Sequence, residues 1–267
     1  MTDSLRVLGA RGSVPVSGER YARFGGQTTC FFLRLGGTPV ILDAGSGLMD
    51  VGACLQPEET QASLLLTHPH ADHLLGFPLC PPVMRPGFRL DVFAATRYGL
   101  SAEEQIGAYM SPPLWPVEPK HLPGDIEFHE LTEHQQVGAV AVQTMEGIHP
   151  GGVSILRLSC GEKSVVLATD CTLTDTLLPM LAEFASGCDL LLCDGQYSPA
   201  EWELRSNFGH STWTAAALLG QLSGAKETRI IHHDPGHDDA FLLAAEDALR
   251  REYPRCAFAR EGEEVLL

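Results

Sequence analysis

The sequence is poor in positive charge. Lysine and arginine together number 18, against 34 aspartate and glutamate residues, so the formal net charge is −16 at pH 7. No stretch of the chain is rich in lysine or arginine. Because a phosphate backbone binds clustered positive charge, we expect no nucleic-acid polymer as the main partner. A small-molecule substrate of modest charge fits better, and bound divalent ions would offset part of the negative charge locally.

Long apolar runs are also missing. No run approaches the roughly 20 residues that a membrane span needs, so no membrane contact is expected. The start, MTDSLRVLGARGS, lacks the basic residues and the apolar core of a signal peptide. The eight cysteines have no paired, metal-type spacing, and several lie in apolar runs such as DLLLCD (189–194). This pattern is typical of reduced, buried thiols and predicts a cytoplasmic protein; a homodimer is left open.

The length bounds the architecture. With 267 residues, of which 44% are hydrophobic and 19% charged, the chain can bury a full core. One domain over residues 1–267 is the main expectation, and two small domains are the alternative on length alone. The stretch 78–124 is rich in proline and aromatic residues, as in LCPPVMRPGF (79–88). It predicts an insertion or lid over the core.

Short apolar runs typical of strands recur in both halves of the chain. They cover residues 5–10, 28–35, 39–43, 62–67, 125–131, 137–145, 153–159, 164–170, 189–194 and 228–233. Helical patterns cover residues 101–110, 174–185, 211–222 and 238–253, and Ser101 and Glu104 have the spacing of a capping box. Two sets of strands, each followed by helices, predict a β-sandwich covered by helices on its outer faces. A single parallel, doubly wound sheet is the alternative.

The stretch THPHADH (67–73) concentrates three histidines and an aspartate directly after the apolar run ASLLL. Pro69 favours an extended backbone at His68. Positions two apart in an extended chain lie on the same side, so His68 and His70 can converge on one point. Asp72 and His73 fall where a helical turn begins and would project toward a second point. Two points with two ligands each describe half of a dinuclear metal site.

The remaining ligands of such a site should follow later strands, because sites collect at the C-terminal strand ends of layered α/β proteins. His149 in MEGIHPGG and Asp170 in VVLATD qualify, and so do His232 and His233 in RIIHHDP. Asp194 in LLLCDGQ also ends a strand, where it would either hold a histidine or cap a turn.

THPHADH resembles the HxHxDH signature of the metallo-β-lactamase fold. Asp43 in ILDAGSG, His149, Asp170 and the late histidine match the other characteristic positions of that family in order, so the resemblance covers nearly the whole chain. GARGSVPV, FGGQTTC, GHST and IIHHDP are similar to the ribonuclease Z-like and phosphodiesterase-like branch. The resemblance implies a layered α+β fold, the αββα sandwich, that binds two divalent metal ions. Zinc is the main expectation, with manganese or iron as alternatives.

The resemblance also implies roles for individual residues. The first metal would be held by His68, His70 and His149, the second by Asp72, His73 and a late histidine, and Asp170 would bridge both. The proline of HHDP favours His232 over His233 for the late position. Asp43 and Asp194 would orient these residues without binding metal.

The chemistry implied by two such ions is hydrolysis by a metal-bridging hydroxide. Asp72 and His210 are the candidate catalytic residues. His210, in GHST, resembles the histidine that serves ribonuclease Z-like enzymes as proton donor; the alternative is a histidine bonded to backbone near a helix start.

The leading hypothesis is therefore a dinuclear metal-dependent hydrolase, a phosphodiesterase acting on a small diester such as a cyclic nucleotide. One alternative is a carbonyl-ester, lactone or thioester hydrolase of the same fold. Ribonuclease Z-like RNA processing is a second, which the net charge disfavours. A non-catalytic metal-binding module is a third, which the complete ligand set disfavours.

Overall fold

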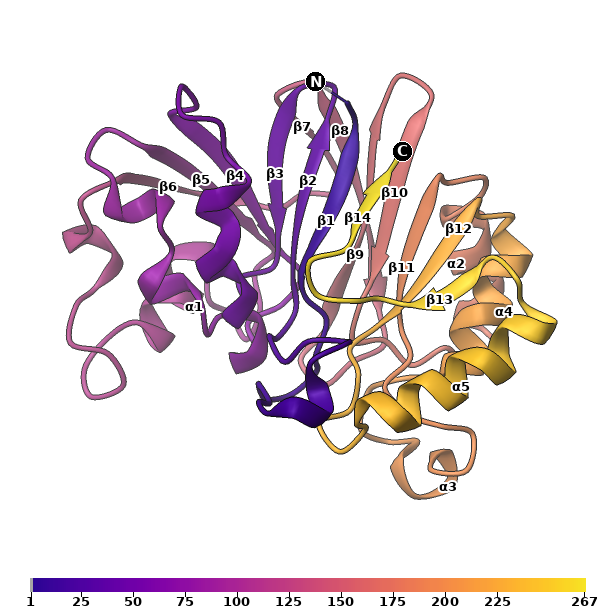
Figure 1. The fold of residues 1–267 in the computed structure, drawn as a ribbon. Coiled ribbons are helices and arrows are strands. Elements are labelled where there is room, and N and C mark those ends of the chain that lie inside the picture. Colours follow the sequence, from indigo (N-terminus) through magenta and orange to yellow (C-terminus); the bar gives the residue numbers. More distant parts are fainter. Residues whose placement is uncertain (1) are drawn as a thin grey trace.

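The computed structural model describes residues 2–267, which form two seven-stranded sheets. Figure 1 shows the two sheets in the middle of the molecule, with α1 beside the first and α2, α4 and α5 beside the second. The predicted αββα sandwich, a layered α+β fold, is confirmed, and the single doubly wound sheet is not formed.

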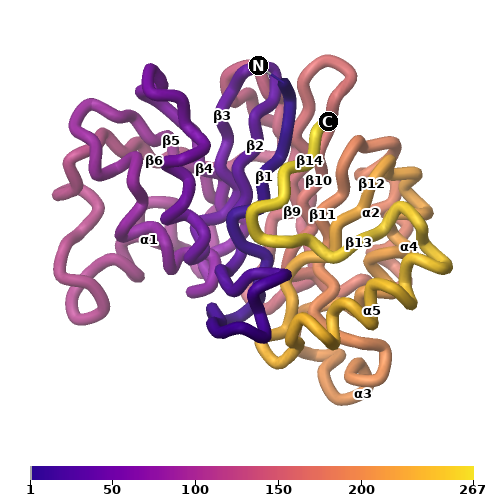
Figure 2. The backbone as a smooth tube through the Cα atoms, in the orientation of Figure 1, coloured from indigo at the N-terminus to yellow at the C-terminus, as the bar shows by residue number. Residues whose placement is uncertain are grey.

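The first sheet has the strand order β14-β1-β2-β3-β4-β5-β6. Its strands are β1 (Ser4–Gly9), β2 (Cys30–Leu35), β3 (Thr38–Leu42), β4 (Gln61–Leu66), β5 (Arg89–Ala94), β6 (Asp125–Glu130) and β14 (Glu264–Leu266). The last strand pairs with the first, and Leu266 lies opposite Ser4. Figure 2 shows how this pairing brings the two ends of the chain to the same end of the sheets.

The second sheet has the strand order β13-β12-β11-β10-β9-β8-β7. Its strands are β7 (His134–Val137), β8 (Val140–Gly147), β9 (Val153–Cys160), β10 (Lys163–Ala168), β11 (Leu190–Asp194), β12 (Glu227–Ile231) and β13 (Cys256–Phe258). Strands β10, β11, β12 and β13 run parallel to one another.

The helices lie between strands in the chain. They are α1 (Ala102–Tyr109), α2 (Leu177–Phe184), α3 (Trp202–Arg205), α4 (Trp213–Ser223) and α5 (Asp239–Glu252). Short 3-10 helices are η1 (Glu19–Tyr21), η2 (Ser46–Ala53), η3 (Ala71–His73), η4 (Phe77–Leu79), η5 (Pro82–Met84) and η6 (Pro119–His121). The capping box predicted at Ser101 and Glu104 is present at the start of α1.

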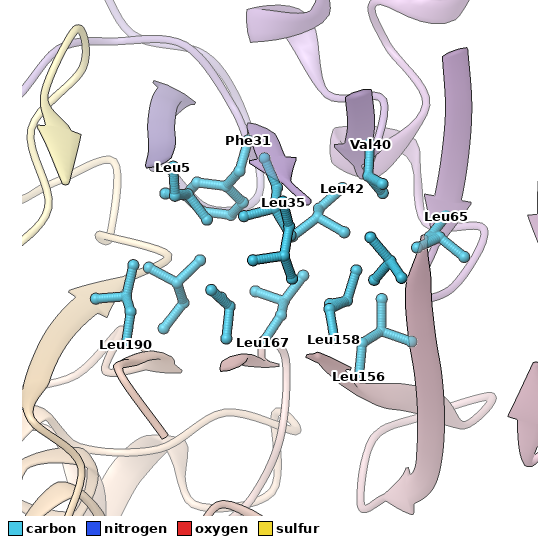
Figure 3. Close-up of a cluster of buried hydrophobic side chains, with 14 of the residues drawn as sticks. Leu5, Phe31, Leu35, Val40, Leu42, Leu65, Leu156, Leu158, Leu167 and Leu190 are labelled. Carbon is cyan, nitrogen blue, oxygen red and sulfur yellow. The ribbon is translucent and has the colours of Figure 1, made fainter. Parts of the chain in front are cut away.

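Three apolar layers hold the sandwich together. Between the sheets, Leu33 and Leu42 of the first sheet belong to the same buried cluster as Leu158 and Leu167 of the second (Figure 3). Because successive side chains of a strand point to opposite faces, the neighbours of these residues pack outward. They meet η2 and α1 on the first sheet, and α2, α4 and α5 on the second. Both sheets are thus buried on both faces, which explains the continuously apolar strands.

The strands direct several polar residues to one edge of the sandwich. Strands β3 and β4 run parallel and lead into Asp43 and Thr67. In the second sheet β10, β11 and β12 run parallel and lead into Asp170, Asp194 and His232. Carboxyl ends of parallel strands meet at the same edge. This edge lies opposite the chain termini, which are at the top of Figure 1.

The expectation of an insertion or lid at 78–124 needs correction. Strand β5, in the middle of that stretch, pairs parallel with both β4 and β6. Its Leu90 and Val92 are fully buried, and α1 packs in the same cluster. The stretch therefore completes the first sheet and its outer layer. The strand was missed because its sequence, RLDVFA, carries charges and is preceded by a run of prolines that indicates irregular structure.

Two further expectations concern membrane contact and the state of the cysteines. Among residues 2–267, no helix combines the length and the apolar character that crossing a membrane requires. All eight cysteines are free, and six of them are buried, as expected for reduced core thiols.

Candidate metal centre

Two groups of ligand-type side chains converge at this edge and share Asp170. The first group is His68, His70, His149 and Asp170, and the second is Asp72, His73, Asp170 and His232. Within each group, one ligand atom from every residue lies within 4.8 Å of the others. The structure thus brings together all seven residues that the sequence indicated as metal ligands.

The first group is built from three loops. His68 and His70 follow β4, His149 follows β8, and Asp170 follows β10. His149 Nε2 lies 3.0 Å from His70 Nδ1. Asp170 Oδ2 lies 3.6 Å from His68 Nε2 and 3.8 Å from His149 Nε2.

The second group lies on the other side of Asp170. The short helix η3 carries Asp72 and His73, as expected from a helical turn after the extended His70. His232 Nε2 lies 3.1 Å from Asp72 Oδ2 and 3.2 Å from Asp170 Oδ2. His73 Nε2 lies 3.2 Å from Asp170 Oδ1. Asp170 is therefore placed to contact a cation in either group.

Hydrogen bonds from outside orient four of the histidines. His149 Nδ1 lies 2.8 Å from the carbonyl of Gly209, and His73 Nδ1 lies 2.8 Å from Asp43 Oδ2. A carbonyl and a carboxylate only accept, so both Nδ1 atoms carry a proton and both Nε2 atoms face the centre, where they can bind a metal ion or a second proton. His68 Nδ1 meets Thr67 Oγ1 at 3.0 Å, and His232 Nδ1 meets Gln196 Oε1 at 3.1 Å. Each tautomer is thereby set for ligation.

Two of the inward-facing nitrogens have no hydrogen-bond partner. His68 Nε2 and His73 Nε2 are buried and unpaired. Leaving a buried polar atom unpaired costs about 1–3 kcal/mol, and a bound cation would remove that cost at both atoms. Imidazole nitrogens together with carboxylate oxygens are the donor set of zinc and related divalent ions. The residues therefore fit a divalent metal centre.

Charges in the centre favour a cation. Burial holds the pKa of His68 well below its ordinary value and also lowers the pKa of His70 and of His149, so these rings are neutral. Burial opposes the charged form of His232 as well, but Asp170, Asp72 and Asp194 outweigh it and raise its pKa to about 9. The carboxylates thus draw positive charge toward the shared space, where a metal ion and a proton compete for the same nitrogen.

Asp43 has the orienting role that the resemblance implied. Its carboxylate accepts hydrogen bonds from the Thr67 backbone at 2.8 Å and from the Thr67 hydroxyl at 2.9 Å, besides the one from His73. The same hydroxyl accepts from His68 Nδ1. One buried carboxylate therefore orients a histidine of each group, directly in one case and through Thr67 in the other.

Backbone strain concentrates around the centre. Asp43, Asp170 and His232 adopt positive φ angles of 59°, 48° and 61°, and Ser13 adopts 64°. Such angles are unfavourable for residues other than glycine, at about 1–3 kcal/mol each. Ser13 donates its backbone N–H to Asp72 Oδ2 at 2.8 Å. Four of the five non-glycine residues with positive φ in residues 2–267 are thus candidate ligands or direct partners of one, and the fifth is Tyr98.

Asp194 and His210 form a pair beside the second group. His210 Nδ1 lies 2.8 Å from Asp194 Oδ2, and the His210 ring stacks on His232 with centroids 4.7 Å apart. Asp194 also accepts from the backbone of Cys171 and Gln196, so it both holds a histidine and caps a turn. The alternative of a His210 ring bonded to backbone is not what the structure has. His210 Nε2 is on the side of the ring that Asp194 leaves free.

The two adjacent late histidines face different surroundings. His233 is fully buried, bonds the carbonyl of Ala259 at 2.9 Å and packs against Phe24 and Phe258. Burial, with a contribution from Arg11, lowers the pKa of His233 to about 3. His232 is the one that enters the centre, which agrees with the choice made from the proline of HHDP.

Several residues of the site were not recognised in the sequence. They are Ser13, Thr67, Gln196 and Gly209. Gly209 could have been recognised from the sequence, because it directly precedes His210 in GHST. The structure shows why a glycine is needed there: its φ is +89°, and a Cβ atom would overlap Nδ1 of His149. Ser13 and Gln196 carry no comparable local pattern, because their partners Asp72 and His232 are distant in the chain.

Comparisons with known proteins agree with this fold. A family model described as a β-lactamase superfamily domain matches residues 38–233. The metallo-β-lactamase fold protein YhfI from Bacillus subtilis is similar in structure, with a TM-score of 0.75 and 16% identity over 99% of both chains. A diphosphatase of the PhnP family (0.69, 17% identity, 99% of this chain and 98% of that one) and the short form of human tRNase Z (0.68, 16%, 98% of both) are also similar. No curated protein matches in sequence.

The adjacent histidines provide a test of the ligand set. We expect His232→Ala to lose one of two bound ions, because Nε2 of His232 faces Asp72 and Asp170. His233→Gln should keep both, because its ring bonds Ala259 outside the centre. Elemental analysis of both proteins, purified in zinc-containing buffer, measures the stoichiometry. The opposite pattern would reassign the ligand to His233.

The orienting groups provide a second test. Asp43→Asn should weaken the binding of both ions by about 10–100-fold, since outer carboxylates contribute on that scale and Asp43 serves a histidine of each group. Gln196→Met is the matched control and should weaken only the ion held by His232. Competition titrations with a chromophoric chelator measure both affinities. A loss confined to one ion in Asp43→Asn would contradict the shared role.

Proposed function

The chain belongs to the β-lactamase superfamily, and on that premise we propose that it is a dinuclear metal-dependent hydrolase of a small phosphodiester. The observation that carries the proposal is the pair of ligand groups sharing Asp170, with two buried imidazole nitrogens left unpaired. Unpaired buried imidazole nitrogens also occur outside the centre, at His233 and His237, so the support lies in a combination. Both atoms belong to groups of converging ligand-type side chains, where a cation would remove the cost of leaving them unpaired.

The residues that would hold the ions follow from the two groups. His68, His70 and His149 would bind one ion, Asp72, His73 and His232 the other, and Asp170 both. The five nitrogen and two carboxylate ligands favour zinc, with manganese or iron as alternatives. Divalent ions in such a site activate water as a nucleophile at neutral pH and neutralise charge that develops on a phosphoryl oxygen.

His210 supplies the proton that the leaving group needs. When the bond from phosphorus to the leaving oxygen breaks, that oxygen takes the proton from Nε2 of His210. Nδ1 of His210 retains its own proton and donates it in a hydrogen bond to Asp194 Oδ2 at 2.8 Å. The carboxylate thereby holds the ring with Nε2 available for the transfer. Stacking on His232 places this donor next to the second ligand group.

Two observations support a small phosphodiester as the substrate. Two of the structurally similar proteins are a diphosphatase and a tRNase Z, whose names indicate chemistry on phosphate esters or anhydrides. The net charge of −16 disfavours a nucleic-acid polymer. A small molecule with a single phosphodiester group needs no extended positive surface to bind. It is therefore compatible both with the names of the similar proteins and with the negative net charge.

Substrates that share one leaving group test the proposal. Zinc-reconstituted protein is assayed on bis-p-nitrophenyl phosphate, p-nitrophenyl phosphate and p-nitrophenyl acetate. We expect turnover of the diester to exceed that of the monoester and the acetate, to stop with chelator, and to return with zinc. Asp170→Asn, which removes the shared carboxylate, should be inactive. Zinc-dependent turnover of the acetate without turnover of the diester would overturn the phosphodiesterase assignment.

His210 has its own signature. His210→Ala should retain both ions yet lose about 10²–10⁴-fold in kcat on a diester with an alkoxide leaving group, the usual contribution of a proton donor. It should lose little on a nitrophenyl ester, whose leaving group departs without protonation. Kinetics on both esters and metal analysis of the same samples decide. Equal losses on the two esters would make His210 a binding residue instead.

A further inference from the structure

Only some side chains of the centre are accessible to solvent. The side chains of His68, His73, Asp170 and His232 are at most 2% exposed. Those of Asp72 and His210 are 9% and 10% exposed, and His70 is half-buried. We therefore take His70, Asp72 and His210 as the residues that a substrate meets first.

Large apolar residues are exposed in loops that carry or contact candidate site residues. We name four of them the apolar rim: Val14, Tyr98, Ile148 and Phe208. Val14 follows Ser13, whose backbone binds Asp72. Ile148 precedes His149. Phe208 precedes Gly209, whose carbonyl orients His149, and lies two positions before His210.

Tyr98, from another loop, contacts the segment that follows His149. It lies in a tight turn in which Arg97 and Leu100 exchange backbone hydrogen bonds, and it adopts a φ of +53°. Its hydroxyl stands over Gly151, two positions after His149, so closely that a Cβ atom on Gly151 would overlap it. The ring is nevertheless 67% exposed. The fold therefore fixes an aromatic side chain in solvent beside a candidate ligand loop.

The segments that carry the candidate ligands contain no lysine or arginine next to those ligands. No lysine or arginine lies within two positions of a candidate ligand or of His210. The arginines of adjoining loops are already engaged. Arg11 is buried and donates to the carbonyls of Asp234 and His237, Arg97 pairs with Glu146, and Arg205 pairs with Asp234.

From these observations we propose that the apolar rim binds an apolar group on the non-leaving side of a monoanionic phosphodiester. The proposal rests on the proposed function and narrows its substrate class. Bound ions supply the charge for one phosphate, and no free arginine or lysine near the ligands is available for a second. Four exposed apolar side chains instead offer surface that gains free energy when an aryl or alkyl group covers it.

The test compares two esters that differ only in the non-leaving group. Benzyl p-nitrophenyl phosphate and methyl p-nitrophenyl phosphate carry one negative charge each and release the same phenolate. On the zinc-loaded protein, we expect kcat/KM to favour the benzyl ester by about tenfold, the scale expected for partial burial of one ring.

Matched variants assign the preference to the rim. Phe208→Ser should reduce it severalfold, and so should Tyr98→Asn, in which asparagine tolerates the positive φ. Leu222→Ser is the control, because Leu222 on α4 is as exposed as Phe208, at 56%, but far from His210 in the chain. It should leave the preference unchanged.

The outcomes separate this inference from the proposed function. Turnover of both esters with equal kcat/KM would overturn the apolar rim and leave a phosphodiesterase in place. Turnover of neither would reject the proposed function and the inference with it. Rim variants that change the oligomeric state by light scattering, but not the ratio of the two esters, would make the rim a contact between copies of the chain.

Discussion

Two buried carboxylates, Asp72 and Asp170, bring negative charge into the centre, and the other groups of the centre must balance it. Burial by itself opposes their ionisation, yet the imidazoles around them hold the pKa of each below its ordinary value. Negative charge that is largely withdrawn from water needs positive charge beside it. The neighbouring histidines supply it as protons on His73 and His232, whose pKa values are raised. Bound divalent ions would balance the same carboxylates with more positive charge than these protons do.

The sandwich makes this arrangement rigid by using strand ends. Parallel strands of both sheets stop at one edge, and the residue after the strand turns sharply, as at Asp43, Asp170 and His232. Three buried apolar layers oppose relaxation of those turns. Strain at the ligands is thus tolerated because the strands that lead into them cannot shift without breaking core contacts.

Prediction from the sequence succeeded where the signal was local. THPHADH indicated four of the side chains that converge in the two groups, because spacing within one segment determines which side chains can meet. His232, and not His233, faces the groups, but the proline of HHDP does not give the physical reason, which is the left-handed backbone at His232. Strand β5 was missed because its partners β4 and β6, and not its own composition, determine its pairing. Ser13 and Gln196 were missed because their roles depend on contacts across the fold.

The centre separates groups that must stay fixed from a group that must move a proton. Each of four candidate ligand histidines has its outer nitrogen held by a hydrogen bond, so its inner nitrogen faces the centre, where a metal ion or a proton can bind. His210 has the same kind of outer bond, to Asp194, but its side chain is partly exposed where those of His68, His73 and His232 are closed. His70 is also accessible to solvent, so access alone does not separate a ligand from a donor. His210 differs because it lies outside the two groups that share Asp170 and is held by Asp194, and this combination is why we propose it as the proton donor.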